Sequence, residues 1–143
     1  TTGKDITNYP GAGAAGGMGG GLLAFFNAEL KPGTELLLKA IDFSEKIKGA
    51  DLIITGEGKA DRQTAMGKVP YGILKEAQKE HIPVIVLAGS IENLPELNKA
   101  GFKGIFSIAT GPITLEKAME PEFAKENITR LVSQLYSVIT SFG

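Results

Sequence analysis

The segment from Gly56 to Lys68 holds the side chains of this sequence that are best suited to phosphate chemistry. Over this short stretch the chain supplies two carboxylates, three cations, an amide and a hydroxyl: Glu57, Asp61, Lys59, Arg62, Lys68, Gln63 and Thr64. Cations and backbone N–H groups oppose phosphate charge, and carboxylates hold Mg²⁺ or accept the proton of a hydroxyl group. The segment therefore predicts a site for a phosphorylated ligand, and a solvated polar loop is the alternative interpretation.

A second candidate is the glycine-rich tract of residues 11–21, in a chain that has 19 glycines in all. Its first part has the pattern GxGxxG, formed by Gly11, Gly13 and Gly16. The dinucleotide fingerprint also needs a strand before the first glycine and an acidic residue about twenty positions later, and the sequence has neither. A glycine-rich helix start can bind an anion through its free N–H groups, whereas small residues also let two elements pack closely. Both interpretations stay open.

Composition limits the classes of function. The chain has 143 residues, of which 43% are hydrophobic, with 15 Lys and Arg against 16 Asp and Glu and a net charge of -1. This balance excludes a disordered chain and argues against a nucleic-acid surface. The lack of cysteine and the single histidine exclude disulfides, thiolate metal sites and a multi-histidine cage. Since there is neither a signal peptide nor a long apolar run, we expect a cytoplasmic α/β protein that has no membrane partner.

Strand and helix patterns alternate from residue 51 onward. Three short apolar runs, at 51–55, 83–88 and 104–109, predict the strands of a parallel sheet that is covered on both faces. Apolar residues at helical spacing predict helices over 69–80, over 94–100 and from Ile128 to Phe142. Before residue 51 we expect a helix from Leu22 to Glu29, a helix that Thr34 caps and that ends near Ile41, and a helical turn over 43–47.

This order of elements predicts where the polar segment lies. In open parallel sheets, ligands bind outside the carboxyl ends of the strands. The first predicted strand runs directly into Gly56, and the second ends at Ser90, which becomes a further candidate for lining the site. The three β-α units form only part of a Rossmann-like sheet, so we expect an incomplete domain.

Several motifs are more specific in combination than alone. They are Pro10 to Gly19, Ala28 to Lys31, Ile54 to Gly58 with Asp61 and Gln63, Gly67 to Pro70, Pro83 to Ile85, Ala88 to Ser90, and Phe106 with Ser107. In this order and spacing they resemble the bacterial glycerate kinase family, the type I glycerate 2-kinases. The resemblance implies two α/β domains with the active site in the cleft between them. Residues 1–50 would be a glycine-rich helical segment of the second, inserted domain, and residues 51–143 would be the C-terminal part of the Rossmann-like domain.

The resemblance also implies an activity. The chain would be the C-terminal portion of a kinase that uses ATP and Mg²⁺ to phosphorylate D-glycerate to 2-phosphoglycerate, with an N-terminal remainder of the same protein as its partner. We expect the isolated piece to be inactive and to form homo-oligomers through its unpaired strand edge. The residues alone also permit a nucleotide- or dinucleotide-binding module without its own chemistry, or a regulatory or scaffold domain.

The resemblance assigns residues of the polar segment to the cleft, and their individual roles are hypotheses that rest on the position of this segment at the end of a strand. Glu57, Asp61 and Lys68 are the candidate catalytic residues, and Glu57 and Asp61 are also the candidate ligands of Mg²⁺; the choice of the catalytic base stays open. We expect lysines to meet phosphate or the substrate carboxylate, and polar side chains to donate hydrogen bonds. The candidate substrate- and nucleotide-binding residues are Gly11, Gly13, Gly16, Gly17, Gly56, Gly58, Lys59, Gln63, Thr64, Gly67 and Ser90.

Overall fold

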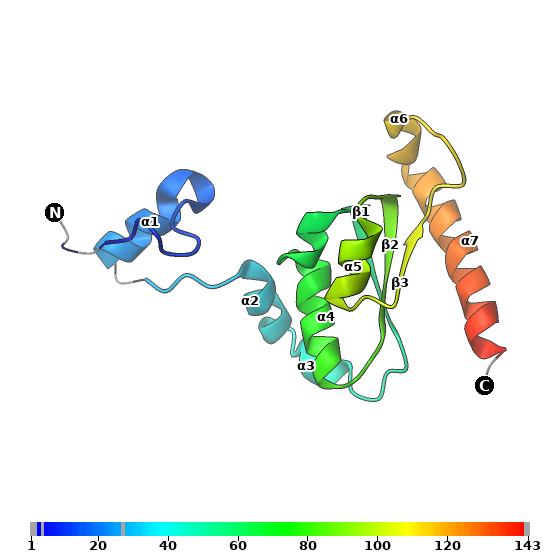
Figure 1. Ribbon diagram of the computed structural model, residues 1–143, viewed down its shortest axis with the longest axis horizontal. Helices are drawn as coiled ribbons and strands as arrows, with labels where there is room; N and C mark the ends of the chain where they lie inside the picture. Colours follow the sequence, from blue (N-terminus) through cyan, green and yellow to red (C-terminus); the bar gives the residue numbers. More distant parts are fainter. Residues whose placement is uncertain (1–2, 4, 27, 142–143) are drawn as a thin grey trace.

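The computed structural model describes residues 3, 5–26 and 28–141 and shows a three-stranded sheet flanked by helices (Figure 1). The helices are α1 (Ala14–Phe26), α2 (Gly33–Ala40), α3 (Phe43–Lys46), the 3₁₀ helix η1 (Arg62–Ala65), α4 (Val69–Lys79), α5 (Leu94–Ala100), α6 (Leu115–Ala118) and α7 (Pro121–Thr140). The strands are β1 (Ile53–Ala60), β2 (Val84–Ile91) and β3 (Gly104–Ser107). The α/β class predicted from the sequence is confirmed.

The three strands are parallel and lie in the order β1-β2-β3. Glu57 of β1 pairs with Ala88 of β2, and Ala88 in turn pairs with Ser107 of β3. The predicted parallel sheet is therefore confirmed, and strands that are consecutive in the sequence are neighbours in it. Because all three strands run in the same direction, their carboxyl ends share one edge of the sheet, and residues that follow β1 and β2 lie near each other there.

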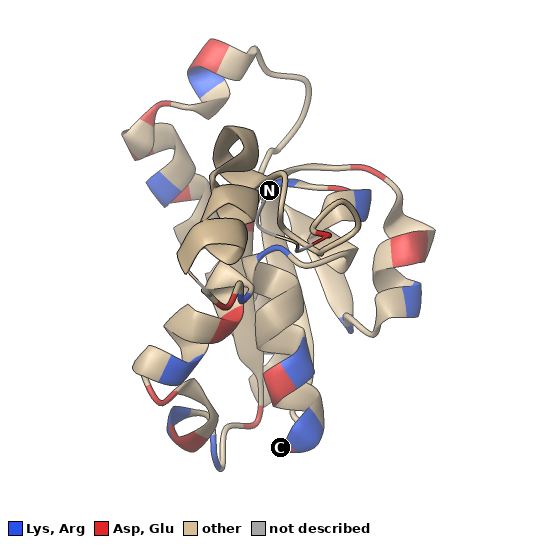
Figure 2. Cartoon of the chain, turned by 90° about the vertical axis from the view of Figure 1, so that its left-hand side faces the viewer, with Lys and Arg blue, Asp and Glu red and all other residues tan. Residues whose placement is uncertain are grey.

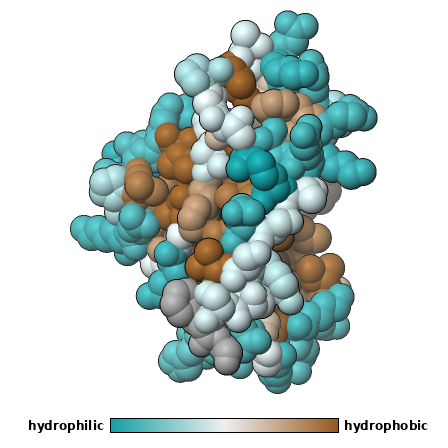
Figure 3. Space-filling view, turned by 90° about the vertical axis from the view of Figure 1, so that its right-hand side faces the viewer, coloured by the Kyte–Doolittle hydropathy of each residue, from teal (hydrophilic) through white to brown (hydrophobic). Residues whose placement is uncertain are grey.

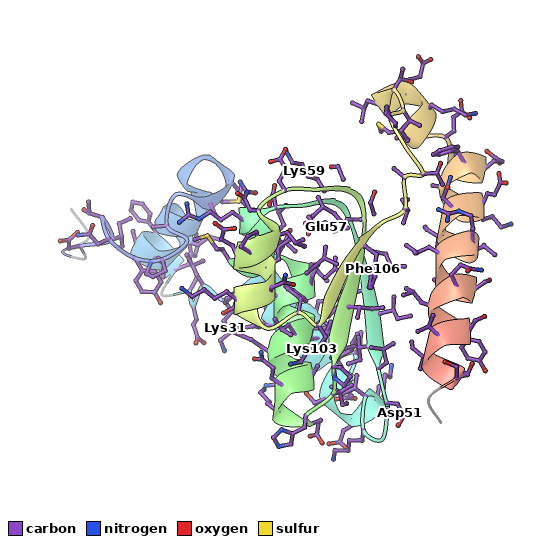
Figure 4. The ribbon with its side chains drawn as sticks, turned by 45° about the vertical axis from the view of Figure 1, so that its right-hand side comes forward. Lys31, Asp51, Glu57, Lys59, Lys103 and Phe106 are labelled. Carbon is purple, nitrogen blue, oxygen red and sulfur yellow. The ribbon has the colours of Figure 1, made fainter. Side chains whose placement is uncertain are left out.

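The core lies between the sheet and the two helices α4 and α5. Successive side chains of a strand point to opposite faces, and Val84 and Val86 of β2 point toward these helices and are fully buried. Leu74 of α4 and Leu97 of α5 fill the space opposite them. In Figures 1 and 4, α4 and α5 lie on one side of the sheet and α7 lies on the other. Both faces of the sheet therefore have a helix beside them.

The strand boundaries differ from the prediction. β1 begins at Ile53 and continues to Ala60, so Gly56 to Ala60 belong to the strand, and the end predicted at residue 55 was wrong. The local glycines and charges are typical of a loop, but β2 extends to Ile91 and its backbone pairs with β1 as far as Ala60. The third strand is shorter than predicted and ends at Ser107. Pairing between neighbouring strands, rather than local composition, sets these ends.

The N-terminal helices also differ from the prediction. α1 starts at Ala14 inside the glycine tract, is kinked at residues 15–17, and ends at Phe26 rather than Glu29; Asn27 lies outside the described residues. Thr34 does not cap α2, because the cap position is Pro32 and Thr34 lies inside the helix. The predicted turn at 43–47 is confirmed as α3, whereas η1 and α6 were not predicted.

The C-terminal helix is longer than expected and leaves much of its apolar surface open. It begins at Pro121, ahead of the predicted Ile128; Phe142 lies outside the described residues. Tyr136 and Val138 keep 67% and 56% of their surface exposed, and Figure 3 shows apolar side chains on this side of the molecule. Among the described residues, no helix combines the length and the apolar content that crossing a membrane requires.

Candidate functional site

Four side chains meet at the carboxyl end of β1. We call this group the carboxylate–lysine cluster; its members are Glu57, Asp61, Thr64 and Lys68. They come from β1, from the residue before η1, from η1 itself and from the residue before α4. Figure 4 shows Glu57 at the end of the sheet opposite Asp51. The cluster therefore lies at the edge where parallel sheets bind their ligands.

The Lys68 ammonium group joins the two carboxylates. Its Nζ lies 2.9 Å from Oε1 of Glu57 and 3.6 Å from Oδ1 of Asp61. The side chains of Glu57 and Asp61 keep 15% and 21% of their surface exposed, and that of Lys68 keeps 36%. The cluster is thus half-buried but open to a ligand from solvent, and its lysine already has carboxylate partners.

Asp61 organises the turn that follows β1. Its Oδ1 accepts hydrogen bonds from the backbone N–H groups of Gln63, at 2.8 Å, and of Thr64, at 3.4 Å. These bonds satisfy donors that the start of a helix would otherwise leave unpaired. Within the part of the chain that the structure describes, Oδ2 of Asp61 accepts no hydrogen bond. Asp61 therefore has one oxygen committed to the fold and one available to a ligand.

Thr64 connects the turn to the strand. Its side chain is fully buried, and its hydroxyl group donates to Oε2 of Glu57 at 2.6 Å and accepts from the backbone N–H of Asp61 at 3.0 Å. Glu57 thus has both oxygens engaged, Oε1 by Lys68 and Oε2 by Thr64. The two carboxylates, which the sequence could not distinguish, differ clearly in their hydrogen bonds.

The electrostatics of the cluster favour the charged forms of Asp61 and Lys68. Partial desolvation alone would raise the pKa of Asp61, but the hydrogen bond from the Gln63 N–H, the charge of Lys68 and the bond from the Thr64 N–H lower this pKa below its ordinary value. The hydrogen bond to Glu57, against some desolvation and helped by the charges of Glu57 and Asp61, raises the pKa of Lys68. At neutral pH, Asp61 is therefore an anion and Lys68 a cation.

The structure places the other predicted polar residues around the cluster. Lys59 forms an exposed ion pair with Glu92, at 2.8 Å, and the hydrogen bond in this pair raises the pKa of Lys59. Ser90 is exposed and pairs in register with Lys59, so it lies at the same edge of the sheet. The side chain of Gln63 is exposed, and its backbone N–H binds Asp61. The side chains of Lys59, Gln63 and Ser90 lie around the cluster and form no hydrogen bond with its four side chains among the described residues.

Glycines shape the backbone on both sides of the cluster. Gly56 and Gly58 are exposed positions of β1, and a Cβ atom at Gly58 would meet nothing within 4 Å. Gly67 has φ of +125°, a conformation that favours glycine, and it directs the chain into α4. Open space above the β1 backbone permits close approach of a ligand there.

The glycine tract does not meet the carboxylate–lysine cluster in this structure. Figure 1 shows α1 set apart from the sheet and connected to it through residues 28–32 and α2. Gly11, Gly16 and Gly17 have φ of +86°, +67° and +91°, and Gly13, Gly16 and Gly17 have open space where a side chain would be. By contrast, a Cβ atom at Gly20 would meet Ala12 O at 3.2 Å. Close packing thus explains Gly20, and the other four remain candidates for ligand binding.

A groove beside the cluster was missed by sequence analysis. It has a volume of about 770 Å³ and runs between α2, α3 and α4, with Gly67 at its border. Its lining mixes charged, polar and apolar residues, and Figure 2 shows Lys, Arg, Asp and Glu interspersed rather than separated by sign on this side of the molecule. No sequence signal could reveal the groove, because it arises from the packing of α2 and α3 against α4. Of the predicted site residues, it includes Gly67.

The carboxylates of the cluster are too few to bind a metal ion alone, and they fit only a site that phosphate groups and water complete. Among the described residues, no three carboxylate or imidazole side chains come together as a metal cage. Mg²⁺ in kinases is held by one or two carboxylates together with the substrate phosphates and water. Asp61, with its available Oδ2, fits that arrangement, whereas Glu57 has both oxygens engaged. Of the two carboxylates, Asp61 is therefore the one whose free oxygen could bind either a metal ion or the proton of a ligand.

Comparisons with known proteins agree on one family. The model of the "Glycerate kinase family" matches residues 1–140. A glycerate kinase of Bacillus cereus is 44% identical over 135 residues, which are 94% of this chain and 35% of the relative. The glycerate 2-kinase of Escherichia coli is 43% identical over 127 residues, which are 88% of this chain and 33% of the relative.

A solved structure agrees with the sequence comparisons. The crystal structure of a candidate glycerate kinase 2 from Salmonella typhimurium LT2 superposes with a TM-score of 0.66 at 36% identity. The match covers 92% of this chain and 32% of that protein. The chain thus spans about a third of the length of the relatives that it matches.

Proposed function

Because this chain belongs to the glycerate kinase family, we propose that it supplies part of the active site for ATP-dependent phosphorylation of D-glycerate to 2-phosphoglycerate. The observation that carries this proposal is the carboxylate–lysine cluster at the carboxyl end of β1. There a half-buried lysine lies beside an aspartate that has one oxygen available. Phosphoryl transfer requires mainly positioning and the neutralisation of charge, and this arrangement supplies both.

Asp61 is the general base in this proposal. Its available Oδ2 accepts the proton of the glycerate 2-hydroxyl group as the oxygen of that group forms a bond to the γ-phosphorus of ATP. The bond between the γ-phosphorus and the bridging oxygen breaks, and ADP leaves. The lowered pKa of Asp61 keeps the base ionised at neutral pH before each turnover.

Lys68 and Glu57 form the electrostatic part of the site. Lys68 stabilises negative charge on the transferring phosphoryl group or on the glycerate carboxylate, and Glu57 holds Lys68 at the site through the 2.9 Å ion pair. Mg²⁺, when bound with ATP, would neutralise the charge of the phosphates; because Oδ2 of Asp61 serves as the base, phosphate oxygens and water would hold the ion. The exposed side chains of Lys59, Gln63 and Ser90 then hydrogen-bond the substrates from the rim of the site.

We also propose that catalysis needs residues beyond this chain. The relatives that match it are about three times longer, so the N-terminal remainder of such a kinase is the partner that would close the cleft. The 143-residue chain alone is then inactive. Because ATP and D-glycerate are the proposed substrates, we propose that the reaction occurs in the cytoplasm. The glycine tract joins the site in this assembled form.

The test is a chimera with the Escherichia coli relative. The matching segment of that glycerate 2-kinase is exchanged for this chain, and ADP formation is measured with ATP, Mg²⁺ and D-glycerate. We expect turnover that depends on all three, and phosphorus NMR of the product should show the phosphate on the 2-oxygen. A folded chimera that binds ATP or NAD but forms no ADP would instead favour a nucleotide-binding module without its own chemistry.

A further inference from the structure

Thr64 lies inside the carboxylate–lysine cluster, where no ligand atom reaches it. Its side chain has no exposed surface, yet its hydroxyl group contacts Glu57 and the backbone of Asp61. The other members of the cluster keep between 15% and 36% of their side-chain surface exposed. Thr64 therefore affects ligand binding only through the side chains that it holds.

The chemistry of the hydrogen bonds fixes the direction of the hydroxyl proton. The backbone N–H of Asp61 can only donate, so at that contact, 3.0 Å long, the Thr64 oxygen is the acceptor. Its single proton is left for Oε2 of Glu57, at 2.6 Å, which is the length of a charge-assisted bond to a carboxylate. With Oε2 fixed in this way, the other oxygen of Glu57 faces Lys68 at 2.9 Å.

We propose that Thr64 is a positioning residue: its buried hydroxyl group fixes the carboxylate of Glu57, and Glu57 in turn fixes the ammonium group of Lys68. Asp61 is then the carboxylate that remains free for the ligand. The identity of that ligand rests on the proposed function, but the chain of contacts from Thr64 to Lys68 does not.

A role in capping alone would have different consequences. Thr64 and Asp61 hydrogen-bond each other reciprocally, and this pair by itself stabilises the short helix η1. Capping does not require Glu57, which lies seven residues away in β1. If capping were the whole role, loss of the hydroxyl group would weaken the turn and leave the pair of Glu57 and Lys68 intact.

The experiment measures the reactivity of lysine side chains in the 143-residue chain. An amine-acylating reagent is used at limiting amounts, and mass spectrometry gives the rate at each lysine. Thr64→Val keeps the volume of the side chain and removes the hydroxyl group, and we expect Lys68 to react about two- to five-fold faster, the change that loss of a half-exposed ion pair produces. Thr64→Ser keeps the hydroxyl group and should restore the original rate.

Two controls distinguish the positioning of Lys68 by Thr64 from a general destabilisation of the fold. Lys59 forms its own ion pair with Glu92, outside the cluster, and its rate should stay constant in every variant. Val84→Ala removes buried volume at the opposite end of β2 and should leave Lys68 unchanged, although it destabilises the fold.

The proposal is overturned if folded Thr64→Val labels Lys68 at the original rate, or if Lys59 and Lys68 accelerate together. Should this variant not fold, NMR of the unmodified chain decides. We expect a slowly exchanging Thr64 hydroxyl proton with a cross-peak to the Glu57 methylene groups, and rapid exchange without that cross-peak contradicts the proposal. An inactive chimera would refute the proposed function without altering either result.

Discussion

Asp61→Asn separates the chemistry of the site from its structure. Asparagine is about as good as aspartate at a helix N-cap, and its Oδ1 can accept the same bonds from the N–H groups of Gln63 and Thr64. The substitution removes the negative charge and the basicity of Oδ2, the oxygen that we assign to the substrate. The fold should therefore survive while catalysis fails.

We expect Asp61→Asn to change stability little and to change turnover strongly. Lys68 lies 3.6 Å from Asp61 but 2.9 Å from Glu57, so the lysine keeps its nearer partner in the variant. Circular dichroism and thermal melting should then show only a small change. Loss of a general base lowers turnover by about 100-fold or more, measured as ADP formation by the chimera at saturating ATP and D-glycerate.

Asp51→Asn provides the matched control. Asp51 carries the same side chain and lies at the opposite end of the sheet, so its substitution should leave turnover within about twofold of the original. Near-normal turnover in Asp61→Asn would refute the assignment of Asp61 as the general base. An equal loss of turnover in both variants would show a general effect of charge rather than a role for Oδ2.

Two further predictions concern stability. The pKa values of Asp61 and Glu76 lie below their ordinary values. The stability that these carboxylates contribute is therefore present above about pH 4 and is lost as the pH falls through the lowered pKa values. The urea concentration at the unfolding midpoint should be constant from about pH 5 to 8 and should decrease below about pH 4. A midpoint that does not change down to about pH 2 would contradict this. At Gly72 of α4 a Cβ atom would overlap the Thr34 methyl group of α2, so Gly72→Ala should lower the free energy of unfolding by about 1–3 kcal/mol relative to Gly33→Ala, whose Cβ atom has open space. Equal denaturant midpoints for the two variants would show that α2 does not pack closely on α4.

The sequence predicts those parts of the fold that depend on local apolar patterns. The apolar run before residue 56, the run after Pro83 and the stripe that includes Leu74 identify β1, β2 and α4, because buried strands and helices need these side chains. The extension of β1 through Gly56 to Ala60 could not be predicted. It depends on pairing with the late residues of β2, and local glycines and charges are typical of a loop.

For the candidate site too, some features were predictable from the sequence and others were not. The types of its residues were visible in the sequence, since two carboxylates and a lysine follow an apolar run. Their contacts were not visible, because the bond from Thr64 to Glu57 joins a helical turn to a strand, and only the folded chain brings them together. Thr64 was therefore predicted as a ligand-binding residue, whereas the structure buries it. The groove between α2, α3 and α4 likewise depends on packing.

The most direct test is a crystal structure of the chimera with D-glycerate and a Mg²⁺-bound, non-hydrolysable ATP analogue. We predict the 2-hydroxyl oxygen of glycerate at about 2.6–3.2 Å from Oδ2 of Asp61, with the terminal phosphate beside Lys68. Glycerate and phosphate bound instead in the groove along α4, or at the glycine tract with the carboxylate–lysine cluster facing solvent, would contradict the account.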